Sequence, residues 1–203
     1  MSLVSFGFQI EGTQLWGMQI DFGVFSAIIV FVWMLAAINS VNLLDGADGF
    51  ATTIGIVISL ALGAMSLQGG KFFDAAIAFG MTGALLGFLR YNFPPAKVFL
   101  GDSGSMLIGF VLAALAIRCS FKQATAYAFF APLALLAIPF IDTLAAIIRR
   151  RLTGRSIYSV DRGHMHHTMA KRGFGPRLSL LWLVMMCSTT AAGAVLAVVY
   201  QES

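Results

Sequence analysis

Charged side chains are scarce in this sequence. Only 11% of the 203 residues are Asp, Glu, Lys or Arg, whereas 59% are hydrophobic, and the mean hydropathy is +0.86. A soluble domain carries about 25% charged residues, so an ordinary soluble protein is excluded. A chain this apolar cannot cover its surface with polar groups, which predicts an integral membrane protein with lipid as its solvent.

Basic residues are absent before Lys71, and there are only two cysteines. Without a positively charged start the sequence does not match a signal peptide, and we expect the first apolar stretch to remain in the mature chain. Cys119 and Cys187 are far apart and lack Cys-x-x-Cys spacing, which argues against a disulfide or a metal site.

The apolar stretches predict an all-α, polytopic transmembrane protein that forms a single domain over residues 1–203. A helix needs about 20 residues to span the hydrocarbon core. Residues 1–21 alternate apolar with polar or Gly positions around Glu11-Gly12-Thr13, which predicts a short outer hairpin. Gly83 and Gly87 form a Gly-x-x-x-Gly pattern that predicts helix packing. The six expected membrane helices cover about 22–41, 50–67, 72–90, 103–119, 124–148 and 178–200.

The basic residues predict the orientation in the membrane. Of the 13 basic residues, all but Lys71, Arg118 and Lys122 lie in the alternate segments 90–103 and 149–177 or at their edges. The positive-inside rule therefore places these segments, with 42–49, in the cytoplasm and both termini outside. The net charge of +4 follows from this topology, so no nucleic-acid partner is needed to explain it.

The first polar cluster reads NLLDGADGF over residues 42–50. Its two Asp-Gly steps allow tight turns, and the carboxylates of Asp45 and Asp48 are close enough in sequence to face one ligand. An EF-hand is disfavoured because the distal Glu of such a loop is missing. A plain turn between two membrane helices remains the alternative.

The second cluster reads NFPPAKVFLGDSGS over residues 92–105. Its prolines prevent helix through the loop, while Gly101 and Gly104 allow backbone N–H groups close to a ligand. A helix N-terminus attracts phosphate, and the adjacent Asp102 is suited to hold Mg²⁺ against phosphate oxygens. The segment is not a P-loop, and an Asp-capped Gly turn remains the alternative.

The third cluster reads SVDRGHMHH over residues 159–167. Arg162, His164, His166 and His167 can bind a diphosphate through charge-assisted hydrogen bonds. Zinc is the competing ligand, but the local motif lacks a convincing set of further ligands.

Taken together, the three clusters resemble the polyprenyl-phosphate N-acetylhexosamine-1-phosphate transferases of glycosyltransferase family 4. Their order and spacing match the family across essentially the whole chain. The DRGHMHH segment is similar to the branch that loads GlcNAc-1-phosphate onto undecaprenyl phosphate. The peptidoglycan branch, which transfers phospho-MurNAc-pentapeptide, usually has three histidines followed shortly by Glu, whereas Thr168 follows His167 here. That branch is the weaker alternative.

The resemblance implies a Mg²⁺-dependent transfer, with Mn²⁺ as an alternative metal, that starts cell-envelope polysaccharide synthesis. The lipid phosphate attacks the β-phosphorus of a UDP-N-acetylhexosamine, a lipid diphosphate sugar forms and UMP leaves. Within the site the resemblance makes Asp102 the metal ligand and places Phe99 and Asn92 against the uridine. It assigns catalytic roles to Asp45, Asp48, Asp102, His164, His166 and His167, and substrate binding to Asn42, Asn92, Phe99 and Arg162.

The resemblance also implies partners and location: undecaprenyl phosphate, a UDP-N-acetylhexosamine and the bacterial inner membrane, with the active site facing the cytoplasm. A homodimer is compatible with the sequence. One feature departs from the family, which carries an adjacent Asp-Asp pair upstream of the first cluster. This sequence has no Asp-Asp dipeptide, so we expect the family's N-terminal helices to be missing.

That departure keeps two other function classes open. One is a non-catalytic nucleotide-binding or assembly protein of the same fold. The other is a transporter, which is disfavoured because the charged groups cluster at one face and not at mid-membrane. Which hexosamine is transferred stays open, because no contact to the sugar is identifiable.

Overall fold

The computed structural model begins with the expected N-terminal hairpin. Strands β1 (Gly12–Leu15) and β2 (Met18–Asp21) pair antiparallel, with Gly12 opposite Asp21 and Leu15 opposite Met18. The hairpin is therefore confirmed, but its expected centre was wrong, because Gly12 and Thr13 belong to β1 itself. The structure describes residues 12–15, 18–21, 23, 25–120, 136–152, 154 and 173–202.

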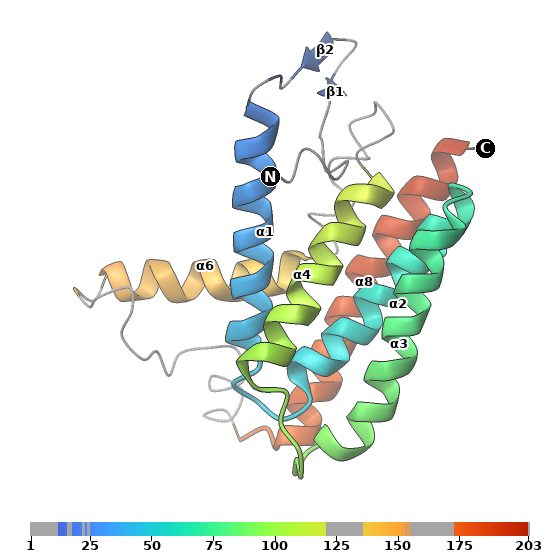
Figure 1. Cartoon of the computed structure of the whole chain (residues 1–203). Helices are drawn as coiled ribbons and strands as arrows, with labels where there is room; N and C mark the ends of the chain where they lie inside the picture. The colour runs from blue at the N-terminus through green and yellow to red at the C-terminus, as the bar shows by residue number, and fades with distance from the viewer. Residues whose placement is uncertain are drawn as a thin grey trace.

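Five helices are long and apolar enough to cross a membrane, and they confirm five of the six expected spans to within a few residues. They lie roughly side by side in Figure 1, so the chain is a multi-pass membrane protein. Uninterrupted apolar sequence explains them, because in lipid every backbone polar group must be satisfied within the helix. These helices are α1 (Phe25–Leu44), α2 (Phe50–Gln68), α3 (Phe72–Asn92), α4 (Gly101–Ser120) and α8 (Pro176–Glu202).

The remaining expected span, 124–148, is described only in its second part. Helix α6 (Ala137–Leu152) ends later than expected, and residues 121–135 lie outside the described residues. In Figure 1 α6 lies across α1 instead of running alongside the other helices. The rings of Trp33 and Phe140 meet edge to face at 5.5 Å and connect the two helices.

Helix α2 is the most buried of the five spans, since 78% of its most apolar 18-residue stretch is buried inside the protein. It packs against α3, α4 and α8, while α1 packs against α4. Close packing depends on Gly55 and Gly63, where an added Cβ would come within 2.7 Å of Leu85 Cδ1 and 2.8 Å of the Phe79 ring.

The Gly83 and Gly87 pair does not take part in this packing. Among the described residues nothing lies within 4 Å of a Cβ added at either position. The expectation of a packing role was therefore wrong within the described chain. The two glycines lie on the exposed side of α3, whereas the glycines that do allow close approach are on α2 and α4.

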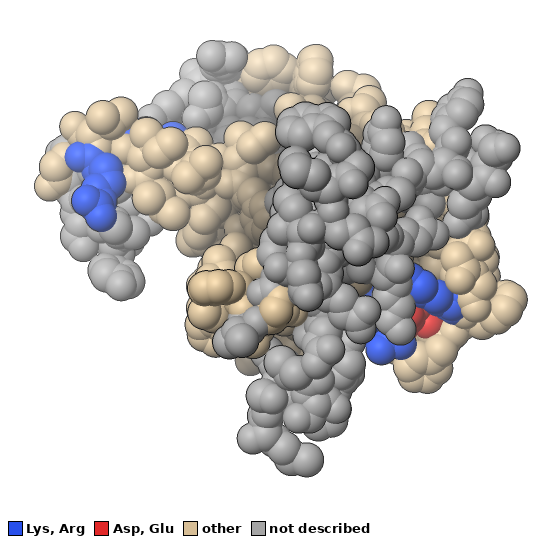
Figure 2. Space-filling model, turned by 90° about the horizontal axis from the view of Figure 1, so that it is seen from above, with Lys and Arg blue, Asp and Glu red and all other residues tan. Residues whose placement is uncertain are grey.

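The helix ends nearest the hairpin carry an ion pair. Arg118 Nε donates to Asp74 Oδ1 at 2.6 Å, and Lys71 Nζ donates to the carbonyls of Arg118 and Cys119. Lys71 thereby satisfies carbonyls at the end of α4, which an α-helix leaves without partners. Figure 2, seen from this end, shows basic and acidic atoms together beside α3 and α4.

Candidate functional site

The end of α1 meets the beginning of α4 at the pole opposite the hairpin (Figure 1). Asn42 Nδ2 donates to Asp102 Oδ1 at 3.1 Å and to Ser105 Oγ at 2.9 Å. A side-chain amide nitrogen carries two hydrogens, so one group can make both bonds. Ser105 is fully buried and donates in turn to the Gly101 carbonyl at 3.0 Å.

These bonds fix the Asp102 carboxylate in the first turn of α4. The partial positive charge of a helix N-terminus stabilises an anion there. Within the part of the chain that the structure describes, Asp102 Oδ2 has no hydrogen-bond partner, and the residue is exposed. The carboxylate is therefore oriented through Oδ1, and Oδ2 bonds no described residue.

Asp45 follows α1 directly and is half-buried. Partial burial, and then the negative charge of Asp102, raise the pKa of the Asp45 carboxyl from 3.8 to about 6. Burial removes the water that stabilises the charged form, and a second carboxylate disfavours that form further. The charge of Asp102 thus acts on Asp45, and a cation bound near both carboxylates would stabilise their charged forms.

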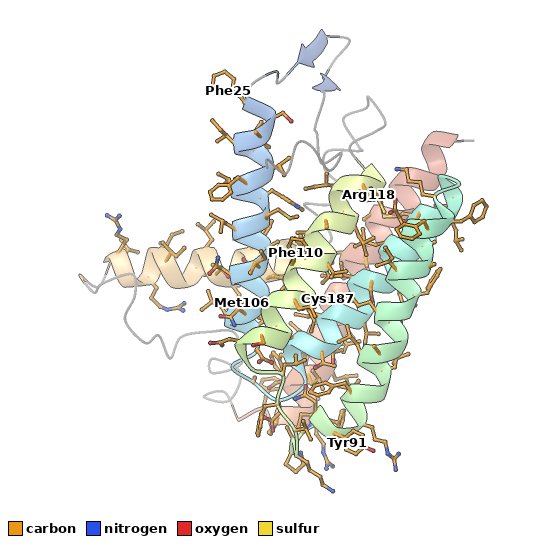
Figure 3. The ribbon with its side chains drawn as sticks, viewed as in Figure 1. Phe25, Tyr91, Met106, Phe110, Arg118 and Cys187 are labelled. Atoms are coloured by element: carbon orange, nitrogen blue, oxygen red, sulfur yellow. The ribbon has the colours of Figure 1, made fainter. Side chains whose placement is uncertain are left out.

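Residues 93–100 form the loop between α3 and α4, and three elements hold it. The Ala96 N–H donates to Asp48 Oδ2 at 2.9 Å, and Arg177 Nε of α8 donates to the Pro94 carbonyl at 3.2 Å. From α3, the Tyr91 carbonyl accepts the N–H groups of Lys97 and Val98. Figure 3 labels Tyr91 at this pole, where the sticks of the loop gather.

Gly49 allows the turn before α2 to approach this loop closely. Its φ is +75°, and an added Cβ would lie 3.3 Å from the Asn92 carbonyl oxygen and 3.5 Å from Pro94 Cδ. An L side chain would be strained at that φ and would press on the loop. The second Asp-Gly step of the first cluster therefore serves the contact with the second cluster.

Asn92 and Phe99, expected together against a uridine, have opposite environments. Asn92 is 2% exposed, and its amide accepts from Thr52 Oγ1 at 2.6 Å and donates to the Val98 carbonyl at 2.9 Å. Phe99 is 68% exposed. The Phe99 ring is accessible for stacking, whereas the Asn92 side chain is engaged with the protein itself.

The oxygen ligands at this pole fit Mg²⁺. This ion usually binds one or two carboxylates and completes its shell with water and substrate phosphates. Asp102 Oδ2 bonds no described residue, and the charge of Asp102 contributes to the raised pKa of Asp45. Among the described residues there is no group of three or more His, Cys, Asp or Glu for an all-protein metal site.

The structure brings together six of the ten residues expected in the site, from both the first and the second cluster. Arg162, His164, His166 and His167 lie outside the described residues. Sequence reasoning missed the supporting roles of Ser105 and Thr52. Ser105 lay within the quoted second cluster and Thr52 follows the first, but only their hydrogen bonds distinguish them from neighbouring residues.

Comparison with known proteins agrees with this arrangement. Residues 1–120 match the profile of glycosyl transferase family 4, which covers all the described residues of the site except Arg177. The chain belongs to glycosyl transferase family 4. The resemblance inferred from the three clusters is thereby confirmed.

Three relatives place the chain within the family. It is 34% identical over 158 residues to a Bacillus subtilis protein named a probable undecaprenyl-phosphate N-acetylglucosaminyl 1-phosphate transferase, covering 78% of this chain and 44% of that one. It is 34% identical to the decaprenyl-phosphate N-acetylglucosaminephosphotransferase of Mycobacterium tuberculosis, covering 83% of this chain and 46% of the relative. A phospho-N-acetylmuramoyl-pentapeptide-transferase of Clostridium perfringens is 35% identical, with coverage of 73% and 45%. The chain thus spans about half the length of the family members it matches.

Proposed function

We propose that the chain supplies the nucleotide-sugar and metal part of an enzyme that transfers GlcNAc-1-phosphate from UDP-GlcNAc to a polyprenyl phosphate. The observation that carries the proposal is the Asp102 carboxylate, which Asn42 orients and whose charge acts on Asp45, together with the braced loop that contains Phe99. Two relatives named for GlcNAc-phosphate transfer to polyprenyl phosphates support this donor and acceptor class.

In the proposed reaction, an oxygen of the lipid phosphate attacks the β-phosphorus of UDP-GlcNAc. The bond from that phosphorus to the oxygen bridging to the α-phosphorus breaks, and the electron pair leaves with UMP. The products are a polyprenyl diphosphate GlcNAc and UMP. Such phosphoryl transfers depend mainly on positioning and on neutralising charge on the oxygens.

The described residues would divide this work. Phe99 presents an exposed aromatic face to the uracil base, while Asp48 and Asn92 hold its loop. Asp102 and Asp45 would hold Mg²⁺. When bound, Mg²⁺ would neutralise charge on the diphosphate oxygens. The roles of Arg162, His164, His166 and His167 at the diphosphate or sugar remain predictions from the sequence.

We also propose that this pole faces the cytoplasm. Arg90, Lys97 and Arg177 lie near it, and none of the three forms an ion pair with an acidic residue of the described chain. At the hairpin pole Arg118 is neutralised by Asp74, and Figure 3 labels Arg118 there. An excess of Lys and Arg in the loops is typical of the cytoplasmic side.

Nucleotide-sugar binding tests the proposal directly. The chain, purified in detergent, is titrated calorimetrically with UDP-GlcNAc at high and at chelated Mg²⁺. We expect binding that strengthens with Mg²⁺, and UDP-GlcNAc to bind more tightly than UDP-MurNAc-pentapeptide. Absence of Mg²⁺-dependent binding would contradict the proposal, and a preference for the pentapeptide donor would favour the phospho-MurNAc branch.

Transfer itself is measured as UMP release with UDP-GlcNAc and undecaprenyl phosphate. Because the chain spans about half the length of its relatives, the assay is run with the chain alone and with the unmatched N-terminal part of a relative coexpressed. UMP release in either arm that depends on the lipid phosphate and is lost in Asp102→Asn supports the proposal. Lipid-independent release in both arms would contradict it.

Orientation is tested by labelling. Lys97→Cys and Lys71→Cys, each in a background with Cys119→Ala and Cys187→Ala, are treated with a membrane-impermeant maleimide. We expect Cys at 97 to react only in inside-out vesicles and Cys at 71 only in right-side-out cells. The reverse pattern would overturn the orientation.

A further inference from the structure

A buried hydrogen bond joins α2 to the end of α3. Thr52, in the first turn of α2, donates from Oγ1 to Asn92 Oδ1 at 2.6 Å. Thr52 is fully buried and Asn92 is 2% exposed, so water cannot replace this bond at either partner. An unpaired acceptor left at such a depth is costly.

The Val98 carbonyl determines how the Asn92 amide is turned, and the Thr52 hydroxyl pairs the amide oxygen in that orientation. Asn92 Nδ2 donates to the Val98 carbonyl at 2.9 Å, and a backbone carbonyl only accepts hydrogen bonds. If the amide were reversed, its oxygen would face the Val98 oxygen and repel it. The Thr52 hydroxyl satisfies Asn92 Oδ1 in the one orientation that leaves Nδ2 for Val98.

Val98 immediately precedes the exposed Phe99 in the sequence. Loss of the bond from Asn92 would therefore loosen the backbone directly before the Phe99 ring. Asp48 and Arg177 brace the loop further back, at Ala96 and Pro94. Among the described side-chain hydrogen bonds to the loop, the one from Asn92 to Val98 lies nearest to Phe99, and Thr52 supports Asn92 from α2.

We propose that Thr52 is a positioning residue for the nucleotide: it pairs the buried amide oxygen of Asn92, and Asn92 holds the Val98–Phe99 part of the loop in the conformation that binds uridine. The proposal rests on the nucleotide-sugar function proposed above. Thr52 touches no substrate in this scheme and acts only through Asn92. This positioning role explains why the buried hydroxyl of Thr52 lies in an otherwise apolar helix interface.

The neighbouring residue provides a matched control. Thr53 is also buried, at 7% exposure, and within the described chain its Oγ1 has no hydrogen-bond partner. Thr52→Val and Thr53→Val make the same change of shape and polarity one residue apart. Only the first removes a hydrogen bond. Thr52→Ser keeps the hydroxyl, and Thr52→Ala serves as a second loss variant that cannot overpack the interface.

Hydrogen exchange tests the positioning without any ligand. We expect the amides of Ala96, Lys97 and Val98 to exchange at least about fivefold faster in Thr52→Val and Thr52→Ala than in the wild type. Thr53→Val and Thr52→Ser should match the wild type, and exchange in the middle of α2 should not change. Equal exchange of the loop in Thr52→Val and Thr53→Val would overturn the proposal.

UMP affinity, measured by calorimetry on the same chains, tests the consequence. We expect binding to weaken about fivefold or more in Thr52→Val and Thr52→Ala, and to recover in Thr52→Ser. Unchanged UMP affinity despite faster loop exchange would overturn the nucleotide role. If the wild type itself fails to bind UMP, the proposed function falls, and loop exchange alone then decides whether Thr52 positions the loop.

Discussion

Gly109 of α4 lies against Ile38 of α1 so closely that an added Cβ would come within 2.8 Å of Ile38 Cα. The contact is one helical turn from the bond between Asn42 and Ser105, since residues four apart share a helix face. Further along the same interface between α1 and α4, Trp33 Nε1 donates to the Ala113 carbonyl at 3.2 Å. The spacing between α1 and α4 therefore sets the distance between Asn42 and Asp102.

Gly109→Ala is expected to force α1 and α4 apart and to break the contact from Asn42 to Asp102. Overpacking of this kind costs about 1–3 kcal/mol, so thermal unfolding should occur at lower temperature and Mg²⁺-dependent nucleotide binding should weaken. Gly83→Ala is the control, because nothing described lies within 4 Å of its Cβ and alanine favours helix. If both variants have the same unfolding temperature and the same nucleotide affinity, the contact between Gly109 and Ile38 does not position the site.

Phe99→Ala should weaken uridine nucleotide binding by about 1–3 kcal/mol, because it removes a stacking face. The measurement is calorimetry with UMP. Phe73→Ala is the matched control, since Phe73 is 72% exposed, compared with 68% for Phe99, but lies at the opposite end of α3. Equal UMP affinity in wild type and Phe99→Ala would remove Phe99 from the site.

Asp102→Asn should abolish the Mg²⁺ dependence of UDP-GlcNAc binding, because it keeps the shape of the side chain but removes the charge of the ligand. Titrations with and without Mg²⁺ should then coincide. Asp74→Asn is the control: it removes a buried carboxylate paired with Arg118 at the other pole. That control should lose about 1–3 kcal/mol of stability and keep its Mg²⁺ response. A preserved Mg²⁺ response in Asp102→Asn would move the metal site elsewhere.

Asp45 should make the stability of the metal-free protein depend on pH. Its carboxyl has a pKa of about 6 in the folded protein, compared with 3.8 ordinarily, so between these values the folded state holds a proton that the unfolded chain has released. The free energy of unfolding should therefore fall as pH rises across this interval and stay lower above it. Thermal unfolding of Asp45→Asn relative to wild type, measured at pH 4 and pH 8, should show the larger gain at pH 8.

Asp102→Asn provides the control for that pH effect. Removing the charge of Asp102 should lower the pKa of Asp45 and shift the fall in stability to lower pH, leaving the part due to burial. A pH profile of Asp45→Asn parallel to the wild type would show that Asp45 does not titrate in this range.

The sequence by itself determined the membrane class, five of the spans and the three clusters that place the chain in its family. A long apolar run in lipid forms a helix, because a helix satisfies its backbone polar groups internally. The Asp-Gly and Gly-Asp-x-Gly segments indicate turns and carboxylate ligands from a few neighbouring residues alone. It did not determine which glycines pack. Gly83 and Gly87 matched a packing pattern but face outward, whereas Gly109 carries the contact.

Only the tertiary structure decided which residues of the first and second clusters contact one another. Asn42 and Asp102 are far apart in sequence, and their bond exists because antiparallel α1 and α4 pack closely at Gly109. Asn92 matched a substrate-binding position, and only the structure shows that its side chain is buried and bonded to Thr52 and Val98. Sequence patterns report which residue types are present, but burial and hydrogen-bond partners arise only when helices distant in the chain are packed together.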